Sequence, residues 1–205
     1  MPELMLADAL QTIQQAHDVW LVGPGLGRDE TAVHMLTTLL ARPEPLVLDA
    51  DALNLLATHP ELFALCKARR GDTVITPHPA EAARLLNIET SAVQAQRLSA
   101  VRELAQRLNV IALVKGSGTV VSDGEKVSIN QSGNAALASA GQGDVLGGMI
   151  AALIAQGLSA LEATQFGVFL HGAAADQWLQ SYAAGIGLGA SETVDHARIV
   201  LNRLK

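Results

Sequence analysis

The sequence has few aromatic residues, which make up 3% of its 205 residues, and a single cysteine, Cys66. One cysteine excludes an internal disulfide bond and a zinc site built from cysteines. With so few aromatics, the core has to be built from Leu, Ala, Val and Ile. Lys and Arg number 14 against 20 Asp and Glu, and the resulting net charge of −6 argues against a nucleic-acid-binding surface.

Long apolar runs are also missing. The longest one, Val145 to Ala155, is too short to span a bilayer. The first residues lack the basic and apolar regions of a signal peptide. We therefore expect a cytoplasmic protein. Hydrophobic residues make up 49% and charged residues 17%, which indicates one globular domain, residues 1–205, with a single large core.

Short apolar runs alternate with segments of helical periodicity, a pattern typical of parallel sheets that helices cover on both faces. Strands are predicted at 18–22, 46–48, 73–76 and 110–114, and helices at 3–16, 29–41, 52–57, 79–86 and 91–108. A hairpin is predicted around Asp123-Gly124, with strands at 119–121 and 126–129. Three more helices are predicted at about 144–156, 160–181 and 191–204. The fold class is therefore α/β with a mostly parallel central sheet.

Glycines and polar residues follow all four predicted parallel strands. They are Gly23 to Gly27, then Asp49 and Asp51, then His78, and finally Lys115 to Thr119. In such sheets ligands bind at the carboxyl ends of the strands, so these residues are expected to share one cleft. Each also has a structural interpretation: the glycines can serve only as a turn, and the two aspartates can cap the next helix.

The segment Gly133 to Ala155 combines a glycine-rich loop with the start of an apolar helix. Unpaired N–H groups in the first turn of a helix, together with the helix dipole, favour an anion such as phosphate. Asp144 lies at the mouth of this expected site. A carboxylate there suits a base that accepts a hydroxyl proton, or a metal ligand. The alternative is that Asp144 only caps the helix.

Three further side chains are open to two interpretations. His78 lies between two prolines and either contacts a ligand or stabilises a turn. Lys115 ends a buried strand and either contacts phosphate or extends to solvent at the sheet edge. His171 lies in an apolar helix, where a buried structural histidine is the more common case.

Five segments together resemble the ADP-dependent NAD(P)H-hydrate dehydratases, and they occur in the order typical of that family. The segments are VGPGLG (22–27), LVLDADALNLL (46–56), ITPHPAEAARLL (75–86), LVKGSGTVV (113–121) and GNAALASAGQGDVLGGMIAALIAQG (133–157). The resemblance implies a three-layer α/β/α ribokinase-like fold. It also implies that the family domain begins before residue 1, so that the chain is N-terminally truncated and one sheet edge is exposed.

The activity implied by the resemblance is repair of nicotinamide nucleotides. The hydroxyl of hydrated NADH or NADPH (the S form) attacks the terminal phosphate of ADP, and loss of that phosphate regenerates the dinucleotide and leaves AMP. Asp144 matches the catalytic base, and magnesium is the expected cofactor. The nucleotide-binding positions implied are Lys115, Gly116, Ser117, Gly118, Thr119, Gly141 and Gly143. The substrate-binding positions implied are Gly25, Gly27, His78, Asn134 and Asp144, and no residue is assigned as a metal ligand.

The glycine loop departs from the family pattern, with Ala136, Leu137 and Ala140 in place of the usual Gly, Met and Gly. Leucine for methionine conserves volume. The alanines are expected to weaken phosphate binding if these positions need a positive φ.

Two alternatives to the dehydratase are considered: a small-molecule hydroxyl kinase on the same scaffold, and a non-catalytic nucleotide-binding fragment. Family resemblance further implies a homo-oligomer, a tetramer in many members, and a functional link to an NAD(P)H-hydrate epimerase. No nucleic-acid or membrane partner is expected.

Overall fold

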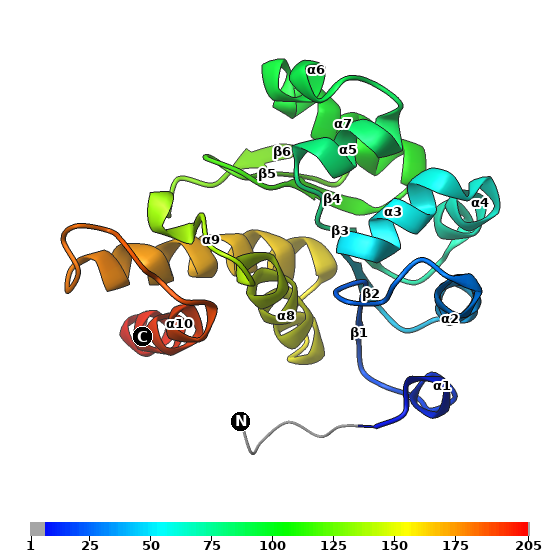
Figure 1. Cartoon of the computed structure of the whole chain (residues 1–205), viewed down its shortest axis with the longest axis horizontal. Helices are drawn as coiled ribbons and strands as arrows, with labels where there is room; N and C mark the ends of the chain where they lie inside the picture. Colours follow the sequence, from blue (N-terminus) through cyan, green and yellow to red (C-terminus); the bar gives the residue numbers. More distant parts are fainter. Residues whose placement is uncertain (1–6, 205) are drawn as a thin grey trace.

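The computed structural model describes residues 7–204, which form a six-stranded sheet with ten α-helices around it (Figure 1). The strands are β1 Trp20–Val22, β2 Leu46–Leu48, β3 Thr73–Ile75, β4 Ile111–Val114, β5 Val120–Ser122 and β6 Val127–Ile129. Their order in the sheet is the order in the chain. β1 to β4 are parallel, and β5 and β6 continue the sheet as an antiparallel hairpin.

The helices follow the strands as the alternating pattern predicts. Their bounds are α1 Ala9–Thr12, α2 Glu30–Leu40, α3 Ala50–Thr58, α4 Pro60–Ala68, α5 Pro79–Leu86, α6 Thr90–Ala95, α7 Arg97–Leu108, α8 Gln142–Ala155, α9 Ala160–Leu179 and α10 Ala190–Arg203, with a 3-10 turn, η1, at Ala135–Leu137. No described helix combines the length and the hydrophobicity needed to cross a bilayer.

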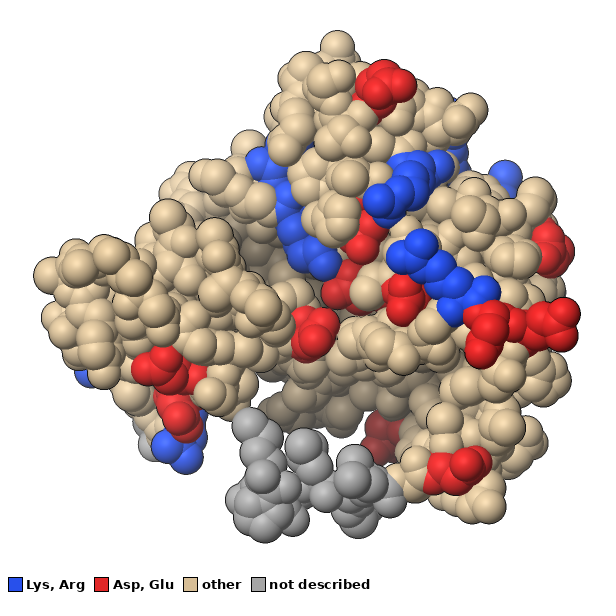
Figure 2. Space-filling model, viewed as in Figure 1, with Lys and Arg blue, Asp and Glu red and all other residues tan. Residues whose placement is uncertain are grey.

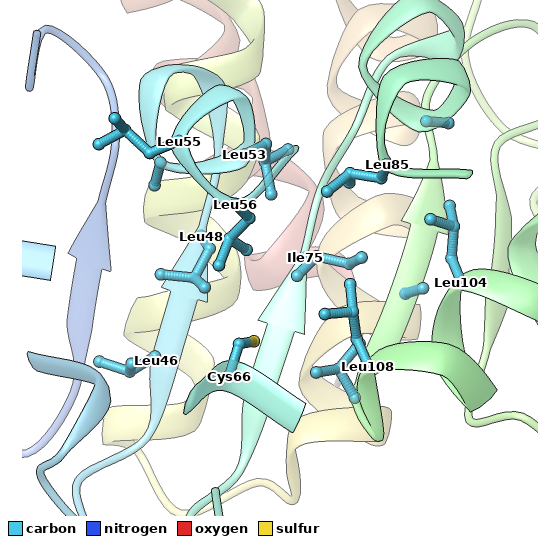
Figure 3. Close-up of a cluster of buried hydrophobic side chains, with 14 of the residues drawn as sticks. Leu46, Leu48, Leu53, Leu55, Leu56, Cys66, Ile75, Leu85, Leu104 and Leu108 are labelled. Carbon is cyan, nitrogen blue, oxygen red and sulfur yellow. The ribbon is translucent and has the colours of Figure 1, made fainter. Parts of the chain in front are cut away.

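Alternation along the strands divides the core into two layers, because successive strand residues point to opposite faces of a sheet. On one face Leu46, Leu48 and Ile75 pack with residues of α2 to α5 and α7 (Figure 3). On the other face Val47 and Val74 pack with residues of α8 and α9. Both faces of the central strands are therefore buried, which explains why these strands are apolar throughout. The layers are those of the predicted α/β/α fold.

The prediction differs from the structure at three places. Of the helix predicted at 3–16, residues 1–6 lie outside the described part, and in the rest only Ala9–Thr12 is helical, starting after the cap Asp8. The helix predicted at 91–108 is broken at Gln96, whose φ of −136° is not helical. Helix α4 was not predicted, although Pro60 occupies a position at its start that favours helices.

Candidate active site

The carboxyl ends of β1 to β4 meet the amino end of α8 (Figure 1). The strand-end residues named from the sequence lie in the loops there, except Asp51, which is in the first turn of α3. Charged side chains of both signs gather in the middle of this face of the molecule, between the part formed by α8 to α10 and the remainder (Figure 2). The helix-start residue Gly143 is close enough to the ends of β2 and β4 for a Cβ there to contact Asp49 and Lys115. The start of α8 and the ends of β2 and β4 therefore lie together, as the sequence predicts.

An ion pair between Asp49 and Lys115 lies at the centre of the site. Lys115 Nζ is 2.7 Å from Asp49 Oδ1, which also accepts the N–H of Ala50. Asp49 is 2% exposed and Lys115 retains 21% of its side-chain exposure. A buried carboxylate needs such a partner, since an unpaired buried charge is strongly unfavourable. Lys115 is thus paired within the site and does not simply extend to solvent at the sheet edge.

The start of α8 lies against this ion pair. A Cβ at Gly143 would lie 3.4 Å from Lys115 Nζ and 3.5 Å from Asp49 Oδ2. Glycine keeps this approach open, so that the Lys115 ammonium lies next to the first helical turn. The N–H groups of Gln142, Gly143 and Asp144 donate to no acceptor among residues 7–204. Free N–H groups, a helix amino end and a lysine are features that favour the binding of an anion.

Asp144 does not cap the helix. The N-cap is Gly141, with φ of +81° and no side-chain cap hydrogen bond. The Asp144 carboxylate is exposed and takes part in no hydrogen bond or ion pair with the described residues. The capping interpretation of Asp144 is therefore wrong, and its carboxylate is available to a ligand.

A cavity of about 520 Å³ opens beside the start of α8. It is lined by the strand-end loop Lys115 to Thr119, by Gln142 and Gly143, by much of the glycine loop, and by Val168, His171 and Gly172 of α9. This volume suits a small-molecule ligand. Six of the seven predicted nucleotide-binding residues line this cavity, and the seventh, Gly141, is the adjoining N-cap.

The loop after β1 contains glycines in conformations that residues with side chains rarely adopt. Gly25 and Gly27 have φ of +65° and +81° and open space where a side chain would be. Asp51 accepts the N–H of Gly27 at 3.1 Å and pairs with Arg28 at 3.0 Å. Asp51 therefore holds the glycine loop against α3, a role that its position in the sequence does not suggest.

His78 and Asn134 both have structural partners. His78 caps α5, since its Nδ1 accepts the N–H of Ala80, and its ring remains exposed. Asn134 caps the 3-10 turn through Ala136 and donates from its side chain to Asp176 at 2.9 Å. Both predicted substrate residues therefore also stabilise the local backbone.

A buried polar network supports the first turn of α8. Gln142 Oε1 accepts from Thr193 and lies 3.1 Å from His171 Nε2. Burial lowers the pKa of His171 to about 4, so the ring is neutral near pH 7. His171 is the buried histidine favoured from the sequence, and it also lines the cavity. Neither Gln142 nor Thr193 was predicted for this site, because their separation in sequence carries no signal.

The two alanines of the glycine loop adopt ordinary backbone conformations. Neither Ala136 nor Ala140 has a positive φ. Neither alanine is therefore strained in this loop, and weaker phosphate binding stays a prediction.

Known structures define the class of protein to which this fold and site belong. An ADP/ATP-dependent NAD(P)H-hydrate dehydratase from Bacillus subtilis, co-crystallised with ATP and Mg²⁺, is 28% identical with a TM-score of 0.82, over 94% of this chain and 66% of that chain. A ribokinase-like superfamily protein from Enterococcus faecalis is 26% identical with a TM-score of 0.81, over 98% of this chain and 70% of that one. The chain is thus a ribokinase-like α/β protein, as predicted.

Sequence comparison gives the family within this class. The model of the NAD(P)H-hydrate dehydratase family matches residues 1–197. The chain is 43% identical to the ADP-dependent (S)-NAD(P)H-hydrate dehydratase of Neisseria meningitidis serogroup B, over 99% of this chain and 70% of that protein. It is also 43% identical to a bifunctional NAD(P)H-hydrate repair enzyme of Vibrio cholerae, over 90% of this chain but only 36% of that protein. The chain belongs to the NAD(P)H-hydrate dehydratase family, which confirms the predicted family.

Proposed function

We propose that this chain, as a single domain, catalyses the ADP-dependent dehydration of (S)-hydrated NADH or NADPH, giving the reduced dinucleotide, AMP and phosphate. The chain covers 70% of the Neisseria relative and about a third of the Vibrio one, so activity of these 205 residues by themselves is part of the proposal. Family membership supports the reaction, and the site suggests which residues perform it.

The observation that carries the proposal is the Asp144 carboxylate, which has no hydrogen-bond or ion-pair partner among residues 7–204. It lies in the first turn of α8, where the N–H groups of residues 142–144 also have no acceptor in that part of the chain. A phosphate-binding turn gains nothing in affinity from an adjacent negative charge. The carboxylate is useful if it accepts the proton of the hydroxyl that attacks phosphorus. We assign this role to Asp144.

In the first step the ring hydroxyl oxygen forms a bond to the β-phosphorus of ADP, its proton passes to Asp144, and the bond to the AMP oxygen breaks. Negative charge grows on the phosphoryl oxygens during transfer. The N–H groups of Gly143 and its neighbours and the Lys115 ammonium are fixed in place to stabilise it. In the second step the C–O bond of the ring phosphate breaks, phosphate departs with the electron pair, and the adjacent ring carbon loses a proton.

We expect magnesium to enter with the nucleotide. Among the described residues no group of three His, Cys, Asp or Glu is placed to hold a metal ion. Mg²⁺ at nucleotide sites is held largely by phosphates and water with one or two carboxylates, so a protein cage is not required. When bound, the ion would neutralise charge on the transferred phosphoryl group.

Substrate and nucleotide are proposed to approach from opposite sides of Asp144. The nucleotide would occupy the cavity lined by Lys115 to Thr119, next to Gly141 and Gly143. The hydrated dinucleotide would lie over Gly25 and Gly27, whose backbone is open to approach, with His78 and Asn134 at its edges.

A cytoplasmic location, a homotetramer and a functional link to an NAD(P)H-hydrate epimerase are also proposed. The functional link is supported by relatives that are named bifunctional NAD(P)H-hydrate repair enzymes.

The test is to incubate the 205-residue chain with hydrated NADH, Mg²⁺ and ADP, and to follow the return of reduced-nicotinamide absorbance. Recovery that depends on ADP, with AMP and phosphate released, supports the proposal. A phosphorylated product that stays in solution would indicate a hydroxyl kinase. ADP binding without any turnover would indicate a non-catalytic nucleotide-binding fragment.

A further inference from the structure

Arg97 reaches the proposed nucleotide loop from outside the cleft. It is the first residue of α7, directly after the break at Gln96. Its guanidinium donates from Nη2 to Val114 O at 2.9 Å and from Nη1 to Ser117 O at 2.5 Å. A Cβ at Gly116 would lie 3.2 Å from Nη2, so the guanidinium packs directly on that glycine. One side chain thus binds two carbonyl groups, one at the last residue of β4 and one in the loop that follows it.

Three carbonyl groups at this loop accept hydrogen bonds from side chains, whereas three of its N–H groups have no acceptor among the described residues. Besides the two carbonyls bound by Arg97, that of Gly116 accepts from Thr119 Oγ1 at 3.1 Å. The N–H groups of Gly116, Ser117 and Gly118 donate to no acceptor in the described chain. Gly116 and Gly118 have φ of +140° and +63°, which successive L-residues with side chains rarely adopt. Free N–H groups in such a turn form a concave site for an anion.

We propose that Arg97 is a positioning residue for nucleotide binding, which rests on the proposed function of this loop. By holding Val114 O and Ser117 O, it keeps carbonyl oxygens turned away from the cavity and N–H groups turned toward the nucleotide phosphates. Without it the peptides around Gly116 can rotate, because glycine imposes little conformational preference. A carbonyl oxygen turned inward would repel phosphate.

The fork geometry of arginine matters here as well as its charge. A guanidinium donates along two fixed directions and reaches both carbonyls at once, whereas the lysine ammonium is a point charge on a flexible stem. Arg97→Lys is therefore expected to restore only part of the function. Arg102 offers a matched control, since it is exposed on the same helix and has no side-chain hydrogen bond or ion pair with the described residues.

The experiment compares Arg97→Met, Arg97→Lys and Arg102→Met with the wild type, measuring Kd for ADP by calorimetry and both KM values by turnover. We expect Arg97→Met to raise Kd and KM for ADP about tenfold, the effect of losing one to two net hydrogen bonds. In Arg97→Met, KM for the hydrated dinucleotide should change less than twofold. Kd and KM for ADP in Arg97→Lys should lie between those of Arg97→Met and the wild type, and those in Arg102→Met should equal the wild-type values.

Unchanged ADP affinity in Arg97→Met would overturn the inference. So would a parallel rise in both KM values with a fall in Tm, since that is a general structural defect, or full function in Arg97→Lys. The binding arm keeps this test separate from the proposed reaction: a wild type that binds ADP without turnover refutes the dehydratase but still permits the comparison of Arg97 variants.

Discussion

Replacing Asp144 with asparagine separates catalysis from stability more cleanly than any other change at this site. The side chain is exposed and makes no hydrogen bond to the described residues, so the variant loses only the interaction between its charge and the helix dipole. That interaction stabilises by about 0.3–1 kcal/mol. In a chain of this size the change corresponds to a fall in Tm of roughly 1–4 °C.

The effect on turnover should be far larger. A general base typically contributes about 10²–10⁴-fold, so kcat is expected to fall by that factor, equivalent to about 3–5 kcal/mol in the barrier. Kd for ADP should stay the same or decrease, since a negative charge next to the phosphate site is removed. The asparagine side chain keeps the shape of aspartate, and the free N–H groups of the helix start are unaffected.

The assay is single-turnover recovery of reduced-nicotinamide absorbance, with Tm and ADP binding measured on the same preparation. Asp195→Asn serves as the control, because it removes one carboxylate that is 70% exposed on α10 and whose ion pair with Arg198, at 3.7 Å, is also exposed. Near-full kcat in Asp144→Asn would refute the assignment of the base. A fall in Tm well beyond that of Asp195→Asn would refute the claim that the carboxylate has no structural role.

Three other changes test the surrounding structure. Gly23→Ala places a Cβ 1.7 Å from the carbonyl oxygen of Asp49, at a φ of +129°. Urea unfolding should show a free energy of unfolding about 3 kcal/mol lower, or the variant should fail to fold. A decrease below about 1 kcal/mol would contradict this packing. Lys115→Met leaves the buried Asp49 without its cation and should lower the free energy of unfolding by about 3 kcal/mol. The double variant Lys115→Met/Asp49→Asn should regain part of this loss. If the double variant is no more stable than Lys115→Met, loss of the ion pair is not the cause. Burial lowers the pKa of His171 from 6.5 to about 4, so between these pH values the unfolded chain binds more protons than the folded chain. His171 therefore lowers the free energy of unfolding by about 3 kcal/mol as pH falls from 6.5 to 4, and has no such effect above pH 6.5. Denaturant unfolding between pH 4 and 6.5 should show that the free energy of unfolding falls more steeply in the wild type than in His171→Gln. Parallel plots of this free energy against pH would refute the prediction.

Much of the fold could be predicted because its signals are local. β2 was predicted with its observed bounds, since Leu46 to Leu48 form a continuous apolar run between turn residues. The hairpin followed from Asp123-Gly124, and in the structure Gly124 has φ of +96° while Asp123 accepts two backbone N–H groups. The break at Gln96 was missed because residues on both sides have the same helical periodicity.

In the candidate site, too, only the features with local signals could be predicted from the sequence. Glycines at the start of α8 and in the loops after β1 and β4 were identified from sequence, because a positive φ or a free helix end restricts the residue type locally. The bonds that hold those loops in place could not be predicted. Asp49 and Lys115 are 66 residues apart in sequence, Gln142 and Thr193 are 51 apart, and Arg97 and Ser117 are 20 apart.

The sequence by itself therefore determined the order of strands and helices, the glycine conformations and the family, since each depends on neighbouring residues or on contiguous motifs. Only the tertiary structure decided that Asp144 has no partner among the described residues, while Asp49, Asp51 and Asp176 have partners. An aspartate looks the same in any sequence, and whether its charge is neutralised depends on which distant cation or N–H group the fold brings within about 3 Å of it.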